Sequence, residues 1–121
     1  MDKPGTGTGI EEAPAATTIF KVVEQQAEFP GGMEALYAYL GENIKFPARA
    51  TEAQQSGTVR LRFVVNEDGS ITNVEVVRGA GYGMDEEATR VVKKMPNWKP
   101  GKNNGKAVKS YFNLPIKFVM H

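Results

Sequence analysis

An alternating segment near the middle of the chain reads Thr58-Val59-Arg60-Leu61-Arg62-Phe63-Val64-Val65. Its odd-numbered residues are all apolar, whereas the even-numbered ones begin with a threonine and two arginines. Because successive side chains of a strand point to opposite faces, this pattern predicts a strand with one buried and one solvated face. The following Asn66-Glu67-Asp68-Gly69-Ser70 contains an Asp-Gly pair, which tolerates the positive φ angles of a tight reversal. We therefore expect a hairpin.

The second arm of this hairpin, Ile71 to Val77, changes phase along its length. Ile71 is out of step with Val74 and Val76, which predicts a bulge near Thr72 and Asn73. A two-stranded hairpin is only marginally stable in water. Other elements must therefore cover its apolar face.

Helical periodicity supplies candidates for this cover. A helix is expected from Gly32 to about Gly41, a short helix is expected after Pro47, and a third is expected from Met84 to Met95. The inward face of the first is predicted to contain Met33, Leu36, Tyr37, Leu40 and Ile44. The inward face of the third is predicted to contain Met84, Ala88, Val91 and Met95.

The C-terminal segment predicts one more strand. Apolar side chains alternate there with more polar ones from Tyr111 to Phe118. Pro115 interrupts this alternation, and because proline lacks an N–H it is confined to edge strands or bulges. We therefore expect an edge strand or a bulge at Pro115. Trp98, between Pro96 and Pro100, is interpreted as an aromatic side chain that fills the core.

Length and composition predict one domain. The chain has 121 residues, enough for a single core. Residues 1–18 carry almost no apolar side chains and are expected to be a disordered linker, so that the domain spans 19–121 and opens with an extended segment. The sequence has no cysteine, no apolar run long enough to span a membrane and no signal peptide. An anchor or an export signal, if the natural protein has one, would be missing from this sequence.

Charge is distributed unevenly. Residues 1–90 contain eight basic and fourteen acidic side chains, whereas 91–121 contain seven lysines and no acid. Such a basic segment is either a solubilising surface or a binding surface for an acidic partner.

The sequence offers little that would support catalysis or cofactor binding. Gly79 to Gly83 lies between a strand and a helix, but three acidic residues follow it and would repel a phosphate. The single histidine is the terminal His121, which argues against histidine-based catalysis and multi-histidine metal sites. Trp98 among lysines resembles a nucleic-acid surface only weakly, since the strands present no aromatic platform. We expect no enzyme activity, no cofactor, no metal and no nucleic acid.

The residues resemble one known family. The similarity rests on an ordered series: Phe46-Pro47-x-x-Ala50, Gly57-x-Val59, Phe63-x-Val65, Asp68-Gly69-x-Ile71, Asp85-Glu86-Glu87-Ala88, Met95-Pro96-x-Trp98-x-Pro100-Gly101-Lys102 and Leu114-Pro115-Ile116-x-Phe118. This series resembles the C-terminal domain of TonB, the energy transducer of Gram-negative outer-membrane transport. The Phe29-Pro30-Gly31-Gly32 entry resembles the Bacteroidetes branch. Where enterobacterial members carry a glutamine and prolines, this chain has Asn43-Ile44-Lys45.

The resemblance implies an α+β fold with two helices and a three-stranded antiparallel sheet, preceded here by the short extended segment. It also implies a monomeric periplasmic domain of a protein anchored in the inner membrane and driven there by a proton-powered motor complex. Such a domain would bind the TonB box of outer-membrane receptors during nutrient uptake, of siderophores or glycans for example. The alternative is a TonB-like protein-binding module of a membrane-anchored, peptidase-like signalling protein, which the sequence upstream of Met1 would distinguish.

The expected mode of binding is the addition of the receptor segment to the C-terminal strand. Main-chain contacts are expected along the strand, and side-chain contacts from the segment beside it. The predicted partner-binding residues are Asn43, Ile44, Lys45, Phe46, Pro47, Ser110, Tyr111, Phe112, Asn113, Leu114, Ile116, Lys117 and Phe118.

Overall fold

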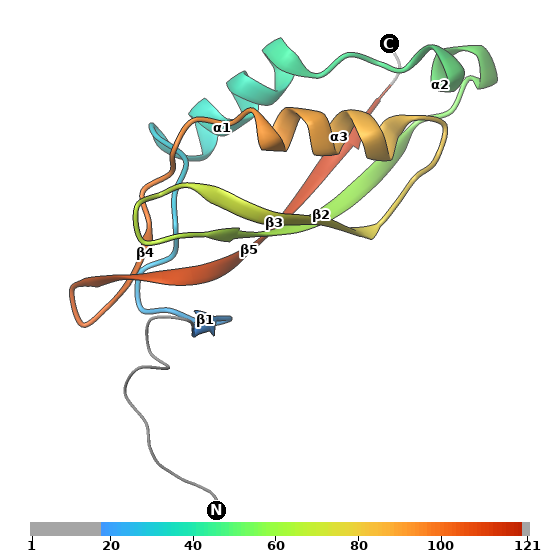
Figure 1. Ribbon diagram of the computed structural model, residues 1–121. Helices are drawn as coiled ribbons and strands as arrows, with labels where there is room; N and C mark the ends of the chain where they lie inside the picture. Colours follow the sequence, from blue (N-terminus) through green and yellow to red (C-terminus); the bar gives the residue numbers. More distant parts are fainter. Residues whose placement is uncertain (1–17, 120–121) are drawn as a thin grey trace, which may run out of the picture.

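The computed structural model describes residues 18–119 (Figure 1). In chain order its elements are β1 (Ile19–Phe20), α1 (Gly32–Asn43), α2 (Ala48–Ala53), β2 (Gly57–Val65), β3 (Ile71–Arg78), α3 (Met84–Lys93), β4 (Gly101–Asn103) and β5 (Lys106–Phe118). The sheet has the order β1-β5-β2-β3, and β4 pairs with the start of β5. Apart from Thr18, the predicted linker lies outside the described residues.

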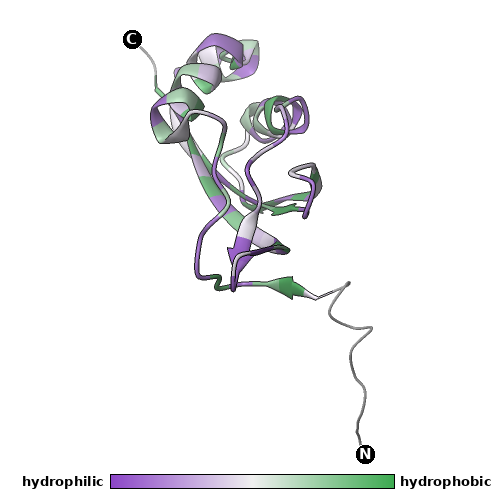
Figure 2. Cartoon of the chain, turned by 90° about the vertical axis from the view of Figure 1, so that its left-hand side faces the viewer, coloured by the Kyte–Doolittle hydropathy of each residue, from purple (hydrophilic) through white to green (hydrophobic). Residues whose placement is uncertain are grey.

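The architecture is the expected α+β fold. The two long helices, α1 and α3, lie side by side over one face of the sheet, as both ribbon views show (Figures 1 and 2). The three long strands, β2, β3 and β5, pair antiparallel in the order β5-β2-β3. The short elements α2, β1 and β4 are added to this two-helix, three-stranded frame.

The pairing of β2 with β5 builds the centre of the sheet. It runs from Gly57 opposite Phe118 to Val65 opposite Ser110 without a register shift. The pairing places the odd-numbered apolar residues of β2 beside the even-numbered ones of β5, on the face that α1 and α3 cover. The core includes, as predicted, Val59, Leu61, Phe63, Val65, Leu114, Ile116 and Phe118, each at most 2% exposed.

The hairpin has the predicted reversal and the predicted bulge. The amide of Gly69 donates to the carbonyl of Asn66 at 2.9 Å, and Gly69 has a φ of 88°. The register between β2 and β3 shifts between Arg62 and Val64, opposite Asn73, which has a φ of 53°. A second shift lies between Arg60 and Leu61. The β3 edge is therefore irregular at two places.

The predicted buried face of α3 is confirmed, but the predicted face of α1 is wrong in part. Met84, Ala88, Val91 and Met95 are buried. In α1, Leu36 and Leu40 are buried, whereas Met33 is 50% and Tyr37 59% exposed. The helix is turned so that Tyr39 packs on the ring of Phe29, at a centroid distance of 5.5 Å. It also continues two residues beyond Gly41, to Asn43.

The segment from Asn97 to Gly105 contains β4, a short strand that the sequence patterns did not predict. Asn104 and Gly105 both have positive φ angles, so they form the type of two-residue turn that joins adjacent antiparallel strands. Main-chain bridges connect β4, and Lys99 two residues before it, to the segment ahead of α1. They pair Gln25 with Lys102 and Glu28 with Lys99.

Trp98 fills the core as predicted and is 3% exposed. Its ring packs edge-on against three aromatic rings, those of Phe29, Phe63 and Phe112, at centroid distances of 5.7, 5.3 and 4.7 Å. These partners come from the segment before α1, from β2 and from β5. One side chain therefore joins three distant parts of the chain.

Trp98→Ala is expected to lower the free energy of unfolding by about 3–5 kcal/mol, because it leaves a cavity between these three rings. Chemical denaturation monitored by circular dichroism measures this loss. Tyr37→Ala is the control for removal of an exposed aromatic ring and should change stability by about 0.5 kcal/mol or less. Equal effects of the two substitutions would contradict the assigned role of Trp98.

Gly69→Ala is expected to destabilise the domain by about 3 kcal/mol or more, since a Cβ at this positive φ would lie 2.1 Å from the carbonyl oxygen of Trp98. Gly105→Ala is the matched control. Its φ is also positive, at 76°, but an added Cβ meets no atom within 4 Å, so only about 1 kcal/mol of backbone strain is expected. Thermal denaturation of both variants tests whether the close approach of Trp98 accounts for the difference.

Candidate functional site

β5 has one side that no strand covers over most of its length. On one side it pairs with β2 from Ser110 to Phe118, and on the other β1 pairs with Lys109 and Ser110 only. Within residues 18–119, β2 is the sole strand paired with 111–118. We call the main chain of 111–118, on the side away from β2, the free edge.

An open groove of about 600 Å³ lies between this edge and α1. Its helix side is formed by Tyr37, Leu40, Gly41 and Ile44, joined by Phe46, and its strand side by Pro115, Ile116, Lys117, Phe118 and Val119. We call it the α1–β5 groove. Its side chains are mostly apolar, and the ring of Phe46 packs edge-on against that of Phe118 at 6.1 Å.

The predicted binding residues of β5 divide into two groups. The side chains of Ser110, Leu114, Ile116 and Phe118 are buried, and Phe112 belongs to the aromatic cluster around Trp98. Their side chains therefore belong largely to the core. Tyr111, Asn113 and Lys117 are on the opposite face, where Asn113 and Lys117 are exposed and Arg62 lies 4.5 Å above the ring of Tyr111.

The predicted residues between α1 and α2 lie beside the end of β5 but play different parts. Ile44 and Phe46 line the α1–β5 groove. Asn43 ends α1, and its side-chain amide donates to the carbonyl of Tyr39 at 2.8 Å. Lys45 is exposed, and Pro47 precedes α2, where its carbonyl accepts from the amide of Thr51. The structure thus brings Ile44 and Phe46 into the groove and leaves Asn43 and Pro47 in structural roles.

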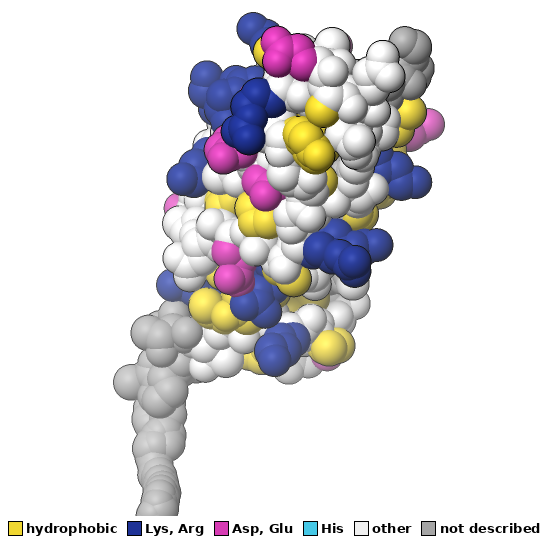
Figure 3. Space-filling view, turned by 90° about the vertical axis from the view of Figure 1, so that its right-hand side faces the viewer, with side chains coloured by type: hydrophobic (Ala, Val, Ile, Leu, Met, Phe, Trp, Pro, Cys, Tyr) yellow, Lys and Arg dark blue, Asp and Glu magenta, His cyan; other side chains and the backbone are white. Residues whose placement is uncertain are grey.

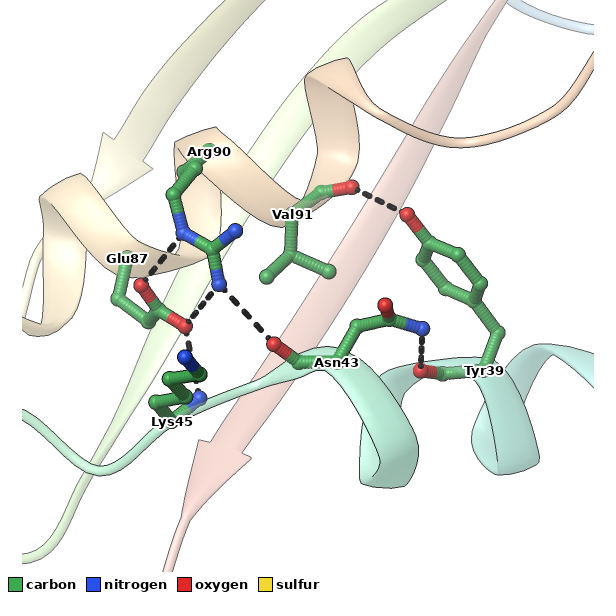
Figure 4. Close-up of polar contacts among 6 residues, drawn as sticks. All are labelled: Tyr39, Asn43, Lys45, Glu87, Arg90 and Val91. Carbon is green, nitrogen blue, oxygen red and sulfur yellow. Dashed lines mark hydrogen bonds and ion pairs between the residues drawn. The ribbon is translucent and has the colours of Figure 1, made fainter.

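A polar network fixes the segment between α1 and α2 to α3 (Figure 4). Arg90 donates from Nε and Nη2 to the two carboxylate oxygens of Glu87, at 2.9 and 2.7 Å. The same carboxylate accepts the amide of Lys45 at 2.7 Å, and Arg90 also donates to the carbonyl of Asn43 at 3.0 Å. The main chain on both sides of Ile44, which lines the groove, is therefore held by charged hydrogen bonds.

These contacts shift the ionisation of the groups involved. The hydrogen bonds from Arg90 lower the pKa of Glu87, assisted by the Lys45 amide and opposed by partial burial. The same pairing raises the pKa of Arg90. Burial raises the pKa of Tyr39, whose hydroxyl donates to the carbonyl of Val91 at 2.9 Å. At neutral pH the network therefore contains a carboxylate, a guanidinium and a neutral phenol.

The main chain of the glycine-containing loop before α3 binds the carboxylate of Asp85, in the first turn of α3. Oδ1 of Asp85 accepts the amides of Ala80 and Gly81 at 2.7 and 3.3 Å. A phosphate would have to displace this carboxylate. The contact with Asp85 therefore accounts for the loop, and no ligand is needed to explain it. In the described part of the chain, no group of three or more histidine, cysteine or acidic residues is placed to hold a metal ion.

Six of the seven C-terminal lysines are exposed, and Lys109 is partly so. Figure 3 shows one side of the molecule, on which acidic side chains lie among the basic ones. Lys117 is the one that lines the α1–β5 groove.

A comparison with family models identifies the domain. Residues 42–120 match the model described as Gram-negative bacterial TonB protein C-terminal. The chain belongs to this family. The matched span includes β2, β3, α3 and β5, and begins near the end of α1, so Tyr37, Leu40 and Gly41 precede it.

A solved TonB domain has a similar fold. The solution structure of the Helicobacter pylori TonB C-terminal domain superposes with a TM-score of 0.54 at 20% identity, covering 72% of this chain and 91% of that one. At this identity the similarity concerns the fold alone. No curated protein matches the sequence. No helix in residues 18–119 has the length and apolar character needed to cross a membrane.

Sequence reasoning placed Ile44 in the binding site but missed Tyr37, Leu40 and Gly41, which form the rest of the helix side of the groove in this TonB-family domain. Tyr37, Leu40, Gly41 and Ile44 follow the three- and four-residue spacing of one helix face, so their proximity to one another was readable. Their position beside Pro115 was not, because it depends on how α1 packs against β5. Three of the four had been predicted to face the core.

Glu87→Gln is expected to remove a pH-dependent part of the stability. Because the folded-state pKa of Glu87 is lowered, its carboxylate stabilises the fold above its ordinary pKa of 4.5, and this contribution is lost as the pH falls through the folded-state value. Urea unfolding from about pH 7 to about pH 3 should therefore show the wild type and the variant converging in acid.

Glu86→Gln is the matched control, since Glu86 is exposed on the same helix turn. It should leave the free energy of unfolding at neutral pH nearly unchanged. A difference between wild type and Glu87→Gln that persists undiminished at low pH would contradict the role given to the Glu87 carboxylate.

Proposed function

We propose that this domain binds the TonB box of an outer-membrane receptor by adding it as a strand to the free edge of β5. In this proposal the domain stands in the periplasm as a monomer and belongs to a protein anchored in the inner membrane. A proton-driven motor complex there supplies the pulling force, and the domain transmits it to the receptor for nutrient uptake. Membership of the TonB family supports the partner, and the free edge supports the mode of binding.

The regularity of β5 is the observation that carries this proposal. Its ladder to β2 is unbroken from Ser110 to Phe118, so its other side offers main-chain groups at regular intervals. The opposite edge of the sheet, β3, carries two register shifts and a residue with positive φ. Such irregularities hinder the pairing of an additional strand. Of the two edges, β5 is therefore the better template.

β1 provides a precedent within the chain itself. Ile19 and Phe20 pair in parallel with Lys109 and Ser110, on the same side of β5 as the free edge. This side of the strand therefore accepts an added segment, and the pairing of β1 stops where the uncovered residues begin. A receptor segment would extend the sheet from that point towards the C-terminus.

Pro115 indicates which main-chain groups face the partner. Alternate residues of an antiparallel strand direct their N–H and C=O to the same neighbour. A proline is tolerated where its missing N–H would face away from the ladder. If the main-chain groups of Pro115 face the free side, those of Tyr111, Asn113 and Lys117 face it as well. The partner then finds donors and acceptors at these three residues and an acceptor only at Pro115.

The hairpin between β2 and β3 supports the same assignment. The amide of Asn66 donates to the carbonyl of Ser70 at 2.9 Å, which places the even-numbered residues at the end of β2 towards β3. Its odd-numbered residues then face β5, where Val65 is opposite Ser110 and Val59 is opposite Ile116. The even-numbered residues of β5 therefore bond to β2, and the odd-numbered ones face outward.

Main-chain recognition of this kind suits a transducer that serves several receptors. Hydrogen bonds to the edge tolerate many partner sequences, because they do not read side chains. The exposed Lys117 places a positive charge beside the edge, which favours an acidic partner and also discourages pairing between copies of the domain.

Lys117→Pro tests the proposed edge directly. It removes an outward-facing N–H, whereas Lys117→Ala removes the charge and retains the donor. With a synthetic TonB-box peptide from a receptor of the same organism, Lys117→Pro is expected to bind about tenfold more weakly than Lys117→Ala, close to the loss of one hydrogen bond. Amide NMR titration measures both affinities and maps the contacts.

The same titration can exclude the proposal. The largest shifts are expected from Tyr111 to Phe118, with Lys117→Pro and Lys117→Ala both folded by their dispersed spectra. Shifts concentrated on β3, with β5 unaffected, would show that the receptor segment binds elsewhere.

A further inference from the structure

Gly41 is a glycine that the domain itself does not require. It lies inside α1, away from the positive φ region that favours glycine. A Cβ built on it meets no atom within 4 Å, so close packing does not exclude a side chain either. Glycine in a helix interior is less favourable than alanine. Neither the backbone nor the packing of the described residues accounts for it.

The space left by Gly41 is part of the α1–β5 groove. Residues three and four apart are neighbours on a helix surface, so Tyr37 and Ile44 flank Gly41 along the groove. Both side chains remain partly or largely accessible, with Tyr37 59% exposed. Gly41 itself lines the groove, and a Cβ built on it would enter open space. A larger residue at position 41 would extend into it.

The groove is continuous with the free edge of β5. Residues of a paired strand lie on the same face as the residues directly opposite them. A segment added to this edge would therefore direct the side chains opposite Ile116 and Phe118 to the face that α1 covers. There they would enter the α1–β5 groove, whose walls on both sides are mainly apolar.

We propose that Gly41 determines specificity by keeping a pocket open for one large apolar side chain of the added strand. The occupant is an extended partner segment whose inward-facing position carries a leucine-sized or larger apolar residue. The inference rests on the strand addition proposed above. Main-chain pairing does not read side chains. The pocket adds a single position at which the partner's sequence matters.

Host–guest peptides test this inference. The probe is a short capped peptide of alternating Thr and Glu, in which one central Thr is replaced by Ala, Leu or Phe. The wild-type domain is expected to bind the Leu and Phe peptides at least about tenfold more tightly than the Ala peptide, as measured by amide NMR titration. Gly41→Leu fills the pocket and should reduce this preference to about twofold or less.

Two variants control for the helix. Ala38→Leu adds the same side chain to an exposed position of α1 that does not line the groove, and it should retain the wild-type preference. Gly41→Ala should raise the melting temperature by about 4 °C while leaving most of the pocket open. Together they separate filling of the groove from a change in helix stability.

The outcomes distinguish this inference from the function on which it rests. If the peptides shift the resonances of Tyr111 to Phe118 but show no preference for Leu or Phe, or if Gly41→Leu retains the preference, the role of Gly41 is wrong and strand addition stands. If no peptide perturbs β5, both proposals fail. Loss of the preference in Gly41→Leu alone, with Ala38→Leu unchanged, supports the pocket.

Discussion

The antiparallel ladder between β2 and β5 is the constraint on which the rest of the domain depends. It joins residues far apart in the chain and fixes which side chains of each strand face the helices. A slip of one residue would turn the apolar set of one of the two strands towards solvent. The same register also decides on which side of β5 the missing N–H of Pro115 would lie. It decides as well which residues of β5 direct main-chain groups to the free edge. The core and the candidate site are thus specified together.

Much of this fold could be predicted because the relevant patterns are local. The alternation in β2 and β5, the Asp-Gly reversal, the phase change at Asn73 and the amphipathic character of α3 are all carried by short segments. The inward face of α1 was harder, since its apolar residues cover more than one side of the helix. Its orientation depends on tertiary contacts such as that of Tyr39 with Phe29. β4 was missed because it is short and carries no apolar side chain, although Asn104-Gly105 marked its turn.

The candidate site was predictable to a smaller extent. Pro115 indicated an edge, and the edge is present; Ile44 and Phe46 were placed beside it and line the groove. The remaining members required the three-dimensional packing of α1 against β5. Ser110 illustrates the reverse case, because it lies on the strand but is enclosed by β1 and β2. A strand pattern identifies which residues alternate, not which neighbours will cover them.

The bridges between the segment ahead of α1 and β4 have a mechanical consequence. A tension applied at the N-terminal side of the domain would meet the two-residue contact of β1 first, and then the main-chain hydrogen bonds of Gln25 to Lys102 and of Glu28 to Lys99. Each of these residue pairs is joined by two reciprocal hydrogen bonds of 2.8–3.1 Å. Behind them, Phe29 is anchored against Trp98. The N-terminal segment is therefore attached in two steps. The outer one is the two-residue pairing of β1, and the inner one consists of four main-chain hydrogen bonds beside the aromatic core.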